Sequence, residues 1–299
     1  MRIAVVGGAG GVGASTAFNL LRDGGPDEVV ILDRRPPHIT SHVMDFDQVL
    51  EQSPGATVRG GDESDLADSD ILVVTAAVPL TVNTSRLVYL EQNAAIVDEV
   101  ADALPDGWDG VVVLVTNPVD PLVLRFRDRT GLDRHRVLGY TLNDSLRLRT
   151  GIANAVGAPP GAVDAWMIGE HGDSSVPLWS RVRVGGEPRA LTPEQKASAE
   201  EYVRSWYVRH VALDSGRSST WTSGLGVSRM VSAIRGDAGA VWPASLVLEG
   251  EYGIEGSAVS VPVVLGADGA REVVEWELAD DELAALHASA EIVRALVEP

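Results

Sequence analysis

The segment Ile168–Pro177 places a histidine, His171, in a setting suited to proton transfer. Its sequence is Ile-Gly-Glu-His-Gly-Asp-Ser-Ser-Val-Pro, so His171 lies between two glycines and two carboxylates. An imidazole with an ordinary pKa of about 6.5 can accept or release a proton near neutrality. The flanking glycines allow a tight backbone turn that presents the ring to a substrate. His171 is therefore the candidate base of an enzyme, and the alternative is a histidine of a polar surface loop.

A second motif, Gly-Ala-Gly-Gly-Val-Gly at residues 8–13, follows an apolar strand and opens a helix. Gly8, Gly10 and Gly13 fit the pattern G-x-G-x-x-G. Glycines at these positions permit a tight turn, close approach of the backbone to a pyrophosphate and close helix packing, while the helix N-terminus offers free N–H groups. The pattern alone is a weak signal because glycine turns are common.

Asp33 strengthens the prediction of a dinucleotide site. It ends the next predicted strand 20 residues after Gly13, where a carboxylate can accept hydrogen bonds from ribose hydroxyls. A carboxylate there would repel the 2′-phosphate of NADP, so NAD is the predicted cofactor. Arg34 and Arg35 leave phosphate contact open, although solvated loop charges are the simpler interpretation.

Composition excludes several other classes of protein. The 299 residues carry a net charge of -19 and include one lysine, Lys196, which argues against a nucleic-acid or anionic-membrane partner. There is no cysteine, so disulfides and thiolate metal sites are excluded. We expect no metal site, because His38 and His42 follow two prolines and lack an adjacent glutamate. No apolar run reaches membrane-span length, and the N-terminus does not read as a secretory signal, so we expect a cytoplasmic protein.

The first half of the chain alternates apolar runs with amphipathic segments, which predicts parallel strands joined by crossover helices. The predicted strands are Arg2–Val6, Glu28–Asp33, Asp70–Thr75, Gly110–Thr116 and Arg136–Leu138; the predicted helices are Val12–Arg22, Thr40–Glu51, Arg86–Ala103, Pro121–Arg129 and Asp144–Ala155. The fold class is α/β. Residues 1–140 are predicted to form a Rossmann domain with a doubly wound parallel sheet.

The pattern changes beyond about residue 140, and residues 141–299 are predicted to form an α+β substrate domain. Thr192-Pro193-Glu194-Gln195 provides an N-cap, a first-turn proline and a capping-box partner for a long helix. The other predicted elements are a helix over Gly226–Ile234, strands over Ala244–Glu249, Ser260–Leu265 and Arg271–Glu277, a hairpin turn at Ala267–Ala270, and a closing helix near Asp280.

The chain resembles the lactate/malate dehydrogenase family from Arg2 to about Glu277, most closely the malate dehydrogenases of lactate-dehydrogenase type, including the halophilic enzymes. The segments that carry the resemblance are Gly7–Gly13, Thr75–Arg86, Thr116–Asp120, Asn143–Arg149, Ile168–Pro177 and Pro243–Gly253. It implies a Rossmann fold, NAD as cofactor, a small 2-hydroxy or 2-oxo acid as substrate, and a homodimer or homotetramer.

The resemblance also implies roles for the residues around His171. His171 corresponds to the family's base, which takes the hydroxyl proton while hydride leaves C2, and Asp144 to the carboxylate that holds the ring's other nitrogen. Near a helix start, Asp144 could alternatively be a cap. Arg147 follows Asp144 by three residues, so both project to one side of a helix, and its fork would bind the substrate carboxylate.

Five further residues receive roles from the resemblance. Arg86 is similar to the arginine on a mobile loop that polarises the reacting carbonyl, and Asn117 to the asparagine that contacts the substrate oxygen beside the nicotinamide. Ser219 and Ser223 lie where the family lines the substrate pocket and the nicotinamide ring, and Thr75 falls in the cofactor-binding set. Structural interpretations remain open, since Asn117 precedes a proline and Arg86 begins a helix.

The sequence departs from the family six residues before Arg86. Malate dehydrogenases carry there an arginine that pairs with the second carboxylate of malate, lactate dehydrogenases carry glutamine, and this chain has Leu80. A carboxylate buried against leucine would lack a partner. We therefore expect an L-2-hydroxy acid with an uncharged side chain as the substrate. The alternatives are a malate dehydrogenase proper with an atypical loop, and a catalytically inactive nucleotide-binding sensor or structural protein.

Overall fold

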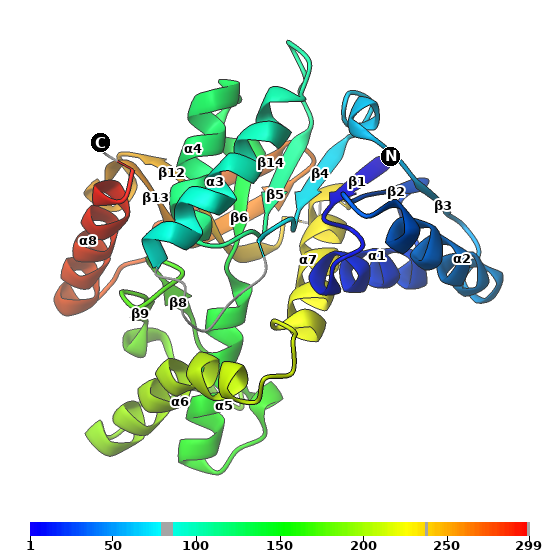
Figure 1. Cartoon of the computed structure of the whole chain (residues 1–299). Helices are drawn as coiled ribbons and strands as arrows, with labels where there is room; N and C mark the ends of the chain where they lie inside the picture. Colours follow the sequence, from blue (N-terminus) through cyan, green and yellow to red (C-terminus); the bar gives the residue numbers. More distant parts are fainter. Residues whose placement is uncertain (79–85, 237–238, 298–299) are drawn as a thin grey trace.

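The computed structural model describes residues 1–78, 86–236 and 239–297, without the side chains of residues 86–88. Within these residues a nine-stranded sheet has the order β14-β13-β12-β6-β5-β4-β1-β2-β3 (Figure 1). Its parallel strands are β1 (Arg2–Val6), β2 (Glu28–Leu32), β3 (Thr57–Gly60), β4 (Ile71–Val74), β5 (Val111–Leu114) and β6 (Val137–Tyr140). Because the strand order reverses beside β1, the sheet is doubly wound, which confirms the predicted Rossmann class.

Helices cover both faces of this sheet, as apolar strands without polar alternation require. The helices α1 (Gly11–Asp23) and α2 (Pro36–Gln52) pack on one face, and α3 (Arg86–Asp102) and α4 (Val119–Thr130) pack on the other. Successive residues of a strand point to opposite faces: Ile71 and Val73 join the first core, whereas Leu72 and Val74 join the second. The carboxyl ends of the strands thus open toward a common edge.

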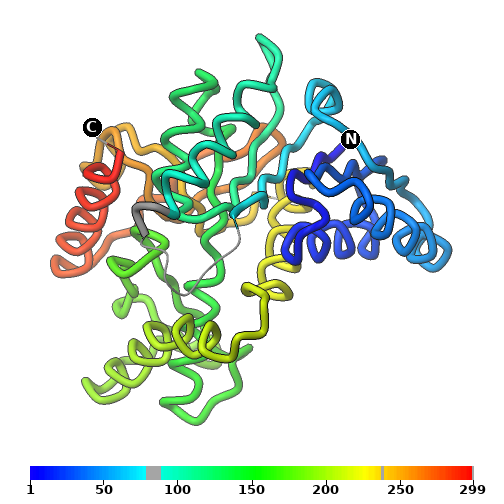
Figure 2. Tube along the Cα trace, viewed as in Figure 1, coloured from blue at the N-terminus to red at the C-terminus, as the bar shows by residue number. Residues whose placement is uncertain are grey.

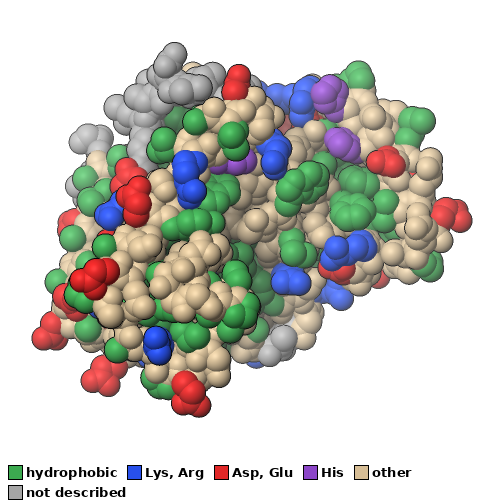
Figure 3. Space-filling model, turned by 90° about the horizontal axis from the view of Figure 1, so that it is seen from below, with side chains coloured by type: hydrophobic (Ala, Val, Ile, Leu, Met, Phe, Trp, Pro, Cys, Tyr) green, Lys and Arg blue, Asp and Glu red, His purple; other side chains and the backbone are tan. Residues whose placement is uncertain are grey.

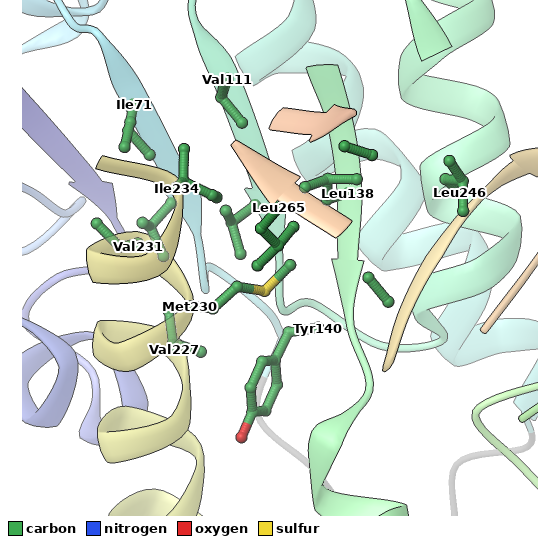
Figure 4. Packing of buried hydrophobic residues seen from close by; sticks show 14 of the residues in the cluster. Ile71, Val111, Leu138, Tyr140, Val227, Met230, Val231, Ile234, Leu246 and Leu265 are labelled. Carbon is green, nitrogen blue, oxygen red and sulfur yellow. The ribbon is translucent and has the colours of Figure 1, made fainter. Parts of the chain in front are cut away.

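The helix α7 (Thr220–Arg235) belongs to the second half of the chain but packs beside α1 on the first face (Figure 2). A Cβ on Gly224 would lie 2.2 Å from Ser15 Oγ of α1, so the two helices approach as closely as only glycine allows. Four apolar side chains of α7 fill the space over the sheet and face Leu138 and Leu265: Val227, Met230, Val231 and Ile234 (Figure 4). This packing fixes α7 relative to the glycine turn that opens α1.

The second half extends the same sheet. The strand β12 (Val241–Glu249) pairs antiparallel with β6, and β13 (Glu255–Gly266) and β14 (Gly269–Val273) follow. Ser245 lies opposite Gly139 in this register. The predicted hairpin turn between β13 and β14 is confirmed, with Gly266 paired to Gly269. Hydrogen bonds therefore run across the expected boundary at residue 140.

The remaining elements lie beneath the sheet, except the last helix of the chain, which packs against β13 (Figure 1). They are α5 (Leu142–Val156), α6 (Pro193–Ala212), α8 (Asp280–Ala295), β7 (Val163–Asp164), β8 (Met167–Ile168), β9 (Val176–Pro177), β10 (Arg183–Val184) and β11 (Glu187–Pro188). The predicted capping box is confirmed: Thr192 Oγ1 accepts from the Gln195 N–H at 3.3 Å, and Gln195 Oε1 accepts from the Thr192 N–H at 3.0 Å. The loop between β8 and β9 carries His171.

One strand was missed, and several predicted boundaries were wrong. The edge strand β3 was not predicted, because only Val58 of its four residues is buried. The strand predicted over Arg271–Glu277 ends at Val273, and α7 begins at Thr220 rather than Gly226, because its first turns carry small and polar residues that lack an apolar period. Among the residues described, no helix combines the length and apolarity needed to cross a membrane.

Candidate active site

The glycine turn between β1 and α1 is held by backbone contacts. The N–H groups of Gly7 and Gly8 both donate to Leu32 O at 2.9 Å, and the N–H of Gly10 donates to Gly7 O at 2.9 Å. A Cβ on Gly13 would lie 2.3 Å from Gly7 O, so a side chain there would force the turn open. The turn has the close packing that a phosphate-binding loop requires.

The N-terminus of α1 leaves backbone donors for a ligand. Within the described chain no side chain caps α1 at its N-cap residue, Gly10, so no side-chain cap takes up the first N–H groups of this helix. Thr75 braces the turn from the end of β4: its hydroxyl donates to Val6 O at 3.0 Å and Gly7 O at 3.2 Å. The donors and the close packing of the turn suit a pyrophosphate, and the role of Thr75 in cofactor binding stays a prediction.

Asp33 lies directly after β2, and Arg35 holds it. Arg35 donates from Nε to Oδ1 at 2.9 Å, from Nη2 to Oδ2 at 3.1 Å and from its backbone N–H to Oδ1 at 3.1 Å. Burial raises the pKa of Asp33, but the hydrogen bonds and charge of Arg35 outweigh it and leave the pKa below its usual value. Asp33 is therefore an ionised acceptor at neutral pH. Arg34 instead forms an ion pair with Glu99 at the surface.

His171, in the loop between β8 and β9, is hydrogen-bonded to Asp144 of α5. Its Nδ1–H donates to Asp144 Oδ2, and both side chains are largely buried, with exposed fractions of 15% and 12%. Burial lowers the pKa of His171, but the charge and hydrogen bond of Asp144, with the charge of Asp120, outweigh it and leave the pKa raised. Because Nδ1 is engaged, Nε2 is the ring nitrogen left to exchange a proton with a substrate.

Two backbone contacts fix the loop that presents His171. Gly169 has φ +83° and exchanges hydrogen bonds with Ser260 of β13, each at 2.9 Å. The backbone N–H of His171 donates to Asp120 Oδ2 at 2.6 Å. A residue with a side chain would be strained at the Gly169 position, which accounts for a glycine there.

Arg147 lies one helical turn after Asp144 on α5 and contacts it. Its Nη1 donates to Asp144 Oδ1 at 3.3 Å, and its guanidinium stacks 4.2 Å from the ring centroid of Trp206 on α6. Burial lowers the pKa of Arg147, although a guanidinium remains charged at neutral pH. Thus His171, Asp144 and Arg147 lie together, with a base, its carboxylate partner and a cation able to bind a carboxylate.

Asn117 ends the segment after β5, and the Asn117–Pro118 peptide is cis. Its carbonyl accepts from Asn93 Nδ2 at 2.7 Å, and Asn93 Oδ1 accepts from the Val78 N–H at 2.9 Å. Asn93 lies on α3 and is fully buried. The side-chain amide of Asn93 therefore connects the segments that follow β4 and β5, where a ligand at the edge of the sheet would lie.

Ser219 and Ser223 lie on the first turns of α7. Ser219 is the residue before the helix, and its carbonyl accepts from the Ser223 N–H at 3.1 Å. Ser223 Oγ accepts from Asn143 Nδ2 at 2.8 Å, and Asn143 Oδ1 accepts from the Tyr140 hydroxyl at 3.0 Å. These bonds connect α7 to Asn143 of α5, the residue directly before Asp144.

Two predicted site residues have no described side chain. Leu80 lies outside the described residues, and for Arg86 the structure gives only the backbone, as the first residue of α3. Their predicted roles therefore remain predictions.

Sequence reasoning did not identify Asn93 and Asp120 as site residues. Each is a polar residue in a helix, a common surface pattern, yet both are buried and bond to residues far away in sequence. For Asp120 a signal was available, because it lies within an otherwise apolar run from Val119 to Leu124 and would be buried wherever that run is buried.

A separate cavity of about 560 Å³ lies between α5, α7 and β12. Arg149, Trp166, Trp221 and Arg229 line part of it, whereas His171 and Asp144 do not. The surface seen from below the sheet carries arginine and lysine side chains across its middle, and acidic side chains lie mostly toward its rim (Figure 3). A predominantly acidic protein thus presents cations on the face that includes α5 and α6.

Comparisons with known proteins cover both halves of the chain. Residues 1–139 match the lactate/malate dehydrogenase NAD binding domain, and residues 141–299 match the lactate/malate dehydrogenase alpha/beta C-terminal domain. A malate dehydrogenase of Halobacterium salinarum is 36% identical over 295 residues, which cover 97% of this chain and 96% of that protein. An L-lactate dehydrogenase 1 of Bifidobacterium longum is 37% identical over 302 residues, covering 97% and 95%.

The fold comparison agrees with the sequence. The structure of the malate dehydrogenase from Aeropyrum pernix superimposes with a TM-score of 0.92 at 29% identity and covers 99% of this chain and 97% of that one. The matching segments include the glycine turn, the His171 loop and both halves of the sheet, since the alignments span nearly the whole chain. The chain belongs to the lactate/malate dehydrogenase family.

Proposed function

We propose that this protein is an NAD-dependent oxidoreductase that interconverts an L-2-hydroxy acid and its 2-oxo acid. The observation that carries the proposal is the cluster of His171, Asp144 and Arg147: a base whose Nδ1 is held by a carboxylate, beside a cation suited to a substrate carboxylate. A protein that only binds nucleotides has no need of an aligned base and clamp.

In this mechanism His171 Nε2 takes the proton of the substrate hydroxyl, and Asp144 stabilises the imidazolium that forms. Arg147 binds the substrate carboxylate through paired N–H groups, which fixes the orientation of C2. Asn117 donates to the reacting oxygen, and Arg86 polarises the carbonyl in the reverse direction. Bound NAD would supply the hydride acceptor. Ser219 and Ser223 line the pocket from α7.

The residues present suit NAD. The turn at Gly8, Gly10 and Gly13 has backbone donors and no room for a side chain, and Asp33 is an ionised acceptor for ribose hydroxyls. A 2′-phosphate would meet the negative charge of Asp33, so NAD is favoured over NADP. The charge of Arg35 is already paired with this carboxylate.

We propose a substrate with an uncharged side chain because of Leu80. The test is an NADH-oxidation panel over pyruvate, longer 2-oxo acids and oxaloacetate, with wild type and Leu80→Arg. Wild type should have a higher kcat/KM on neutral substrates, and Leu80→Arg should shift toward oxaloacetate. A wild-type preference for oxaloacetate would instead favour a malate dehydrogenase proper, a candidate that the identity to the Halobacterium salinarum protein supports.

The third candidate, an inactive nucleotide-binding protein, makes a different prediction. NADH would quench tryptophan fluorescence, yet no 2-oxo acid would be reduced.

We also propose that residues 1–140 form the cofactor-binding domain and residues 141–299 the substrate domain. We propose further that the protein is cytoplasmic, and that it assembles as a homodimer or homotetramer, as the family resemblance implies. Sedimentation at several concentrations would decide the assembly.

A further inference from the structure

A carboxylate that the mechanism above does not use lies directly behind His171. Asp120 is on the first turn of α4, its residue is 1% exposed, and its Oδ2 accepts the backbone N–H of His171 at 2.6 Å. Ser245 of β12 is also fully buried and lies close enough to lower the pKa of Asp120. Within the described residues, however, neither Asp120 Oδ1 nor Ser245 Oγ completes a hydrogen bond.

A buried carboxylate destabilises the fold unless hydrogen bonds or nearby positive charge compensate for its lost hydration. The compensation here is partial: the His171 N–H donates to one oxygen, and the N-terminus of α4 favours a negative charge in its first turn. Burial raises the pKa of Asp120 to about 6, against the opposing effects of Ser245 and His171. The carboxyl is therefore mostly ionised at the neutral to alkaline pH at which His171 would exchange its proton.

His171 is thus flanked by charges from two helices. Asp144 of α5 bonds the ring, and Asp120 of α4 bonds the main chain; both charges favour the imidazolium, whereas Arg147 of α5 opposes it. Glu170, the neighbour of His171, raises the pKa of Asp120. The charge of Asp120 acts on His171 through space, without touching the face of the ring that would meet a substrate.

We propose that Asp120 is a positioning residue for His171, which fixes the backbone of the loop by its hydrogen bond and stabilises the protonated ring by its negative charge. The proposal rests on the proposed function, in which His171 transfers the proton. The proposal predicts that the pKa of His171 depends on the negative charge of Asp120 and not only on its hydrogen bond. An asparagine at position 120 could accept the same N–H and donate toward Ser245 Oγ, and so would keep the loop while removing the charge.

The decisive measurement is the NMR titration of the His171 ring in the free protein, with its resonance assigned by its loss in His171→Gln. In Asp120→Asn the titration midpoint of His171 should fall by about one pH unit. Asp128→Asn is the matched control: it makes the same change on α4, but at a carboxylate that is 55% exposed and paired with Arg127. Its midpoint should equal that of wild type.

The kinetic consequence follows in both directions. With a less basic His171, 2-hydroxy acid oxidation should begin at lower pH, and 2-oxo acid reduction should decline at lower pH, by the same shift. If Asp120 had a purely structural role, its replacement would lower kcat/KM without changing the pH at which oxidation begins or reduction declines. The proposal is overturned if Asp120→Asn has the same His171 titration midpoint as wild type and the same pH dependence of oxidation and reduction, whatever its rate.

Ser245→Ala provides an independent test should Asp120→Asn fail to fold. Removing this hydroxyl should raise the pKa of Asp120, so that more of the carboxyl is neutral when His171 titrates, and the His171 midpoint should fall by a smaller amount. An unchanged midpoint in Ser245→Ala would then contradict the proposal. The titration needs no turnover. A protein inactive on every 2-oxo acid would therefore refute the proposed function, while the His171 midpoints of the variants would still test the role of Asp120.

Discussion

The guanidinium of Arg147 lies over the indole of Trp206, with Cζ 4.2 Å from the ring centroid, while its Nη1 donates to Asp144 Oδ1. Trp206 also stacks on His210, whose Nε2 is bonded to Arg217 O at 2.9 Å. The proposed carboxylate clamp is therefore held by Asp144 of α5 and Trp206 of α6, and His210 connects Trp206 to the segment that leads to α7.

Trp206→Ala should loosen this clamp. Losing the cation–π contact, worth roughly 0.5–2 kcal/mol, should raise KM for a 2-oxo acid by about 2- to 30-fold with a smaller effect on kcat. Trp206→Phe keeps a ring beneath the guanidinium and should recover most of the loss. Steady-state kinetics on both variants gives the answer, and an Ala variant with wild-type KM would show that Arg147 is positioned without Trp206.

Asp144→Asn should shift the pH profile as well as lower the rate. The raised pKa of His171 keeps the imidazolium, the form that donates a proton to a 2-oxo acid, present above pH 6.5. Without the Asp144 charge the pKa should fall, and the decline of kcat/KM for reduction should move to lower pH. We expect kcat to drop about 10²- to 10⁴-fold. A lower rate with an unmoved decline would separate the two effects and contradict the charge argument.

Asp33→Ser should weaken NADH binding and discrimination against NADPH together. The carboxylate both accepts from the ribose and repels a 2′-phosphate, so its loss should raise Kd for NADH about 10-fold and lower the ratio of NADPH to NADH Kd. Glu99→Gln is the control, since it removes an exposed partner of Arg34 at the same edge. Fluorescence titration measures both constants; an unchanged NADPH-to-NADH ratio would remove Asp33 from cofactor selection.

Asn93→Ala should destabilise the protein, because it leaves the Val78 N–H and the Asn117 carbonyl without their partner. Two partly buried groups left without this partner should lower the free energy of unfolding by about 1–3 kcal/mol, measured by urea denaturation. Asn154→Ala, an exposed change on α5, should alter it by less than about 0.5 kcal/mol. Equal stability of the two variants would contradict the bridging role of Asn93.

Five of the six parallel strands were predictable because each is a short apolar run that is largely buried: β1, β2, β4, β5 and β6. The edge strand β3 was not, since Thr57 and Gly60 are exposed and its pairing with β2 depends on the tertiary fold. The same reason explains why α7 could be placed in the sequence but not beside α1, as that contact joins segments about 200 residues apart.

At the site, the sequence identified candidate residues more completely than it identified the side chains with which they pair. The pairing of His171 with Asp144 was expected only through family resemblance, because no local pattern links residues 27 apart. The pairing of Arg35 with Asp33 was not expected; Arg35 had been interpreted as a solvated charge. Asp120 was not among the predicted site residues, and it preceded the helix predicted over Pro121–Arg129; in the structure it lies on the first turn of α4 and is buried.

The central claim is that His171 transfers the proton in a reaction that interconverts 2-hydroxy and 2-oxo acids. The most direct test is NADH oxidation by wild type and His171→Gln on 2-oxo acids with uncharged side chains, with NADH binding measured in parallel. The account predicts turnover by wild type, and in His171→Gln a loss of about 10²- to 10⁴-fold in kcat with NADH affinity retained. Equal rates in the two proteins, or no turnover by wild type on any 2-oxo acid, would contradict it.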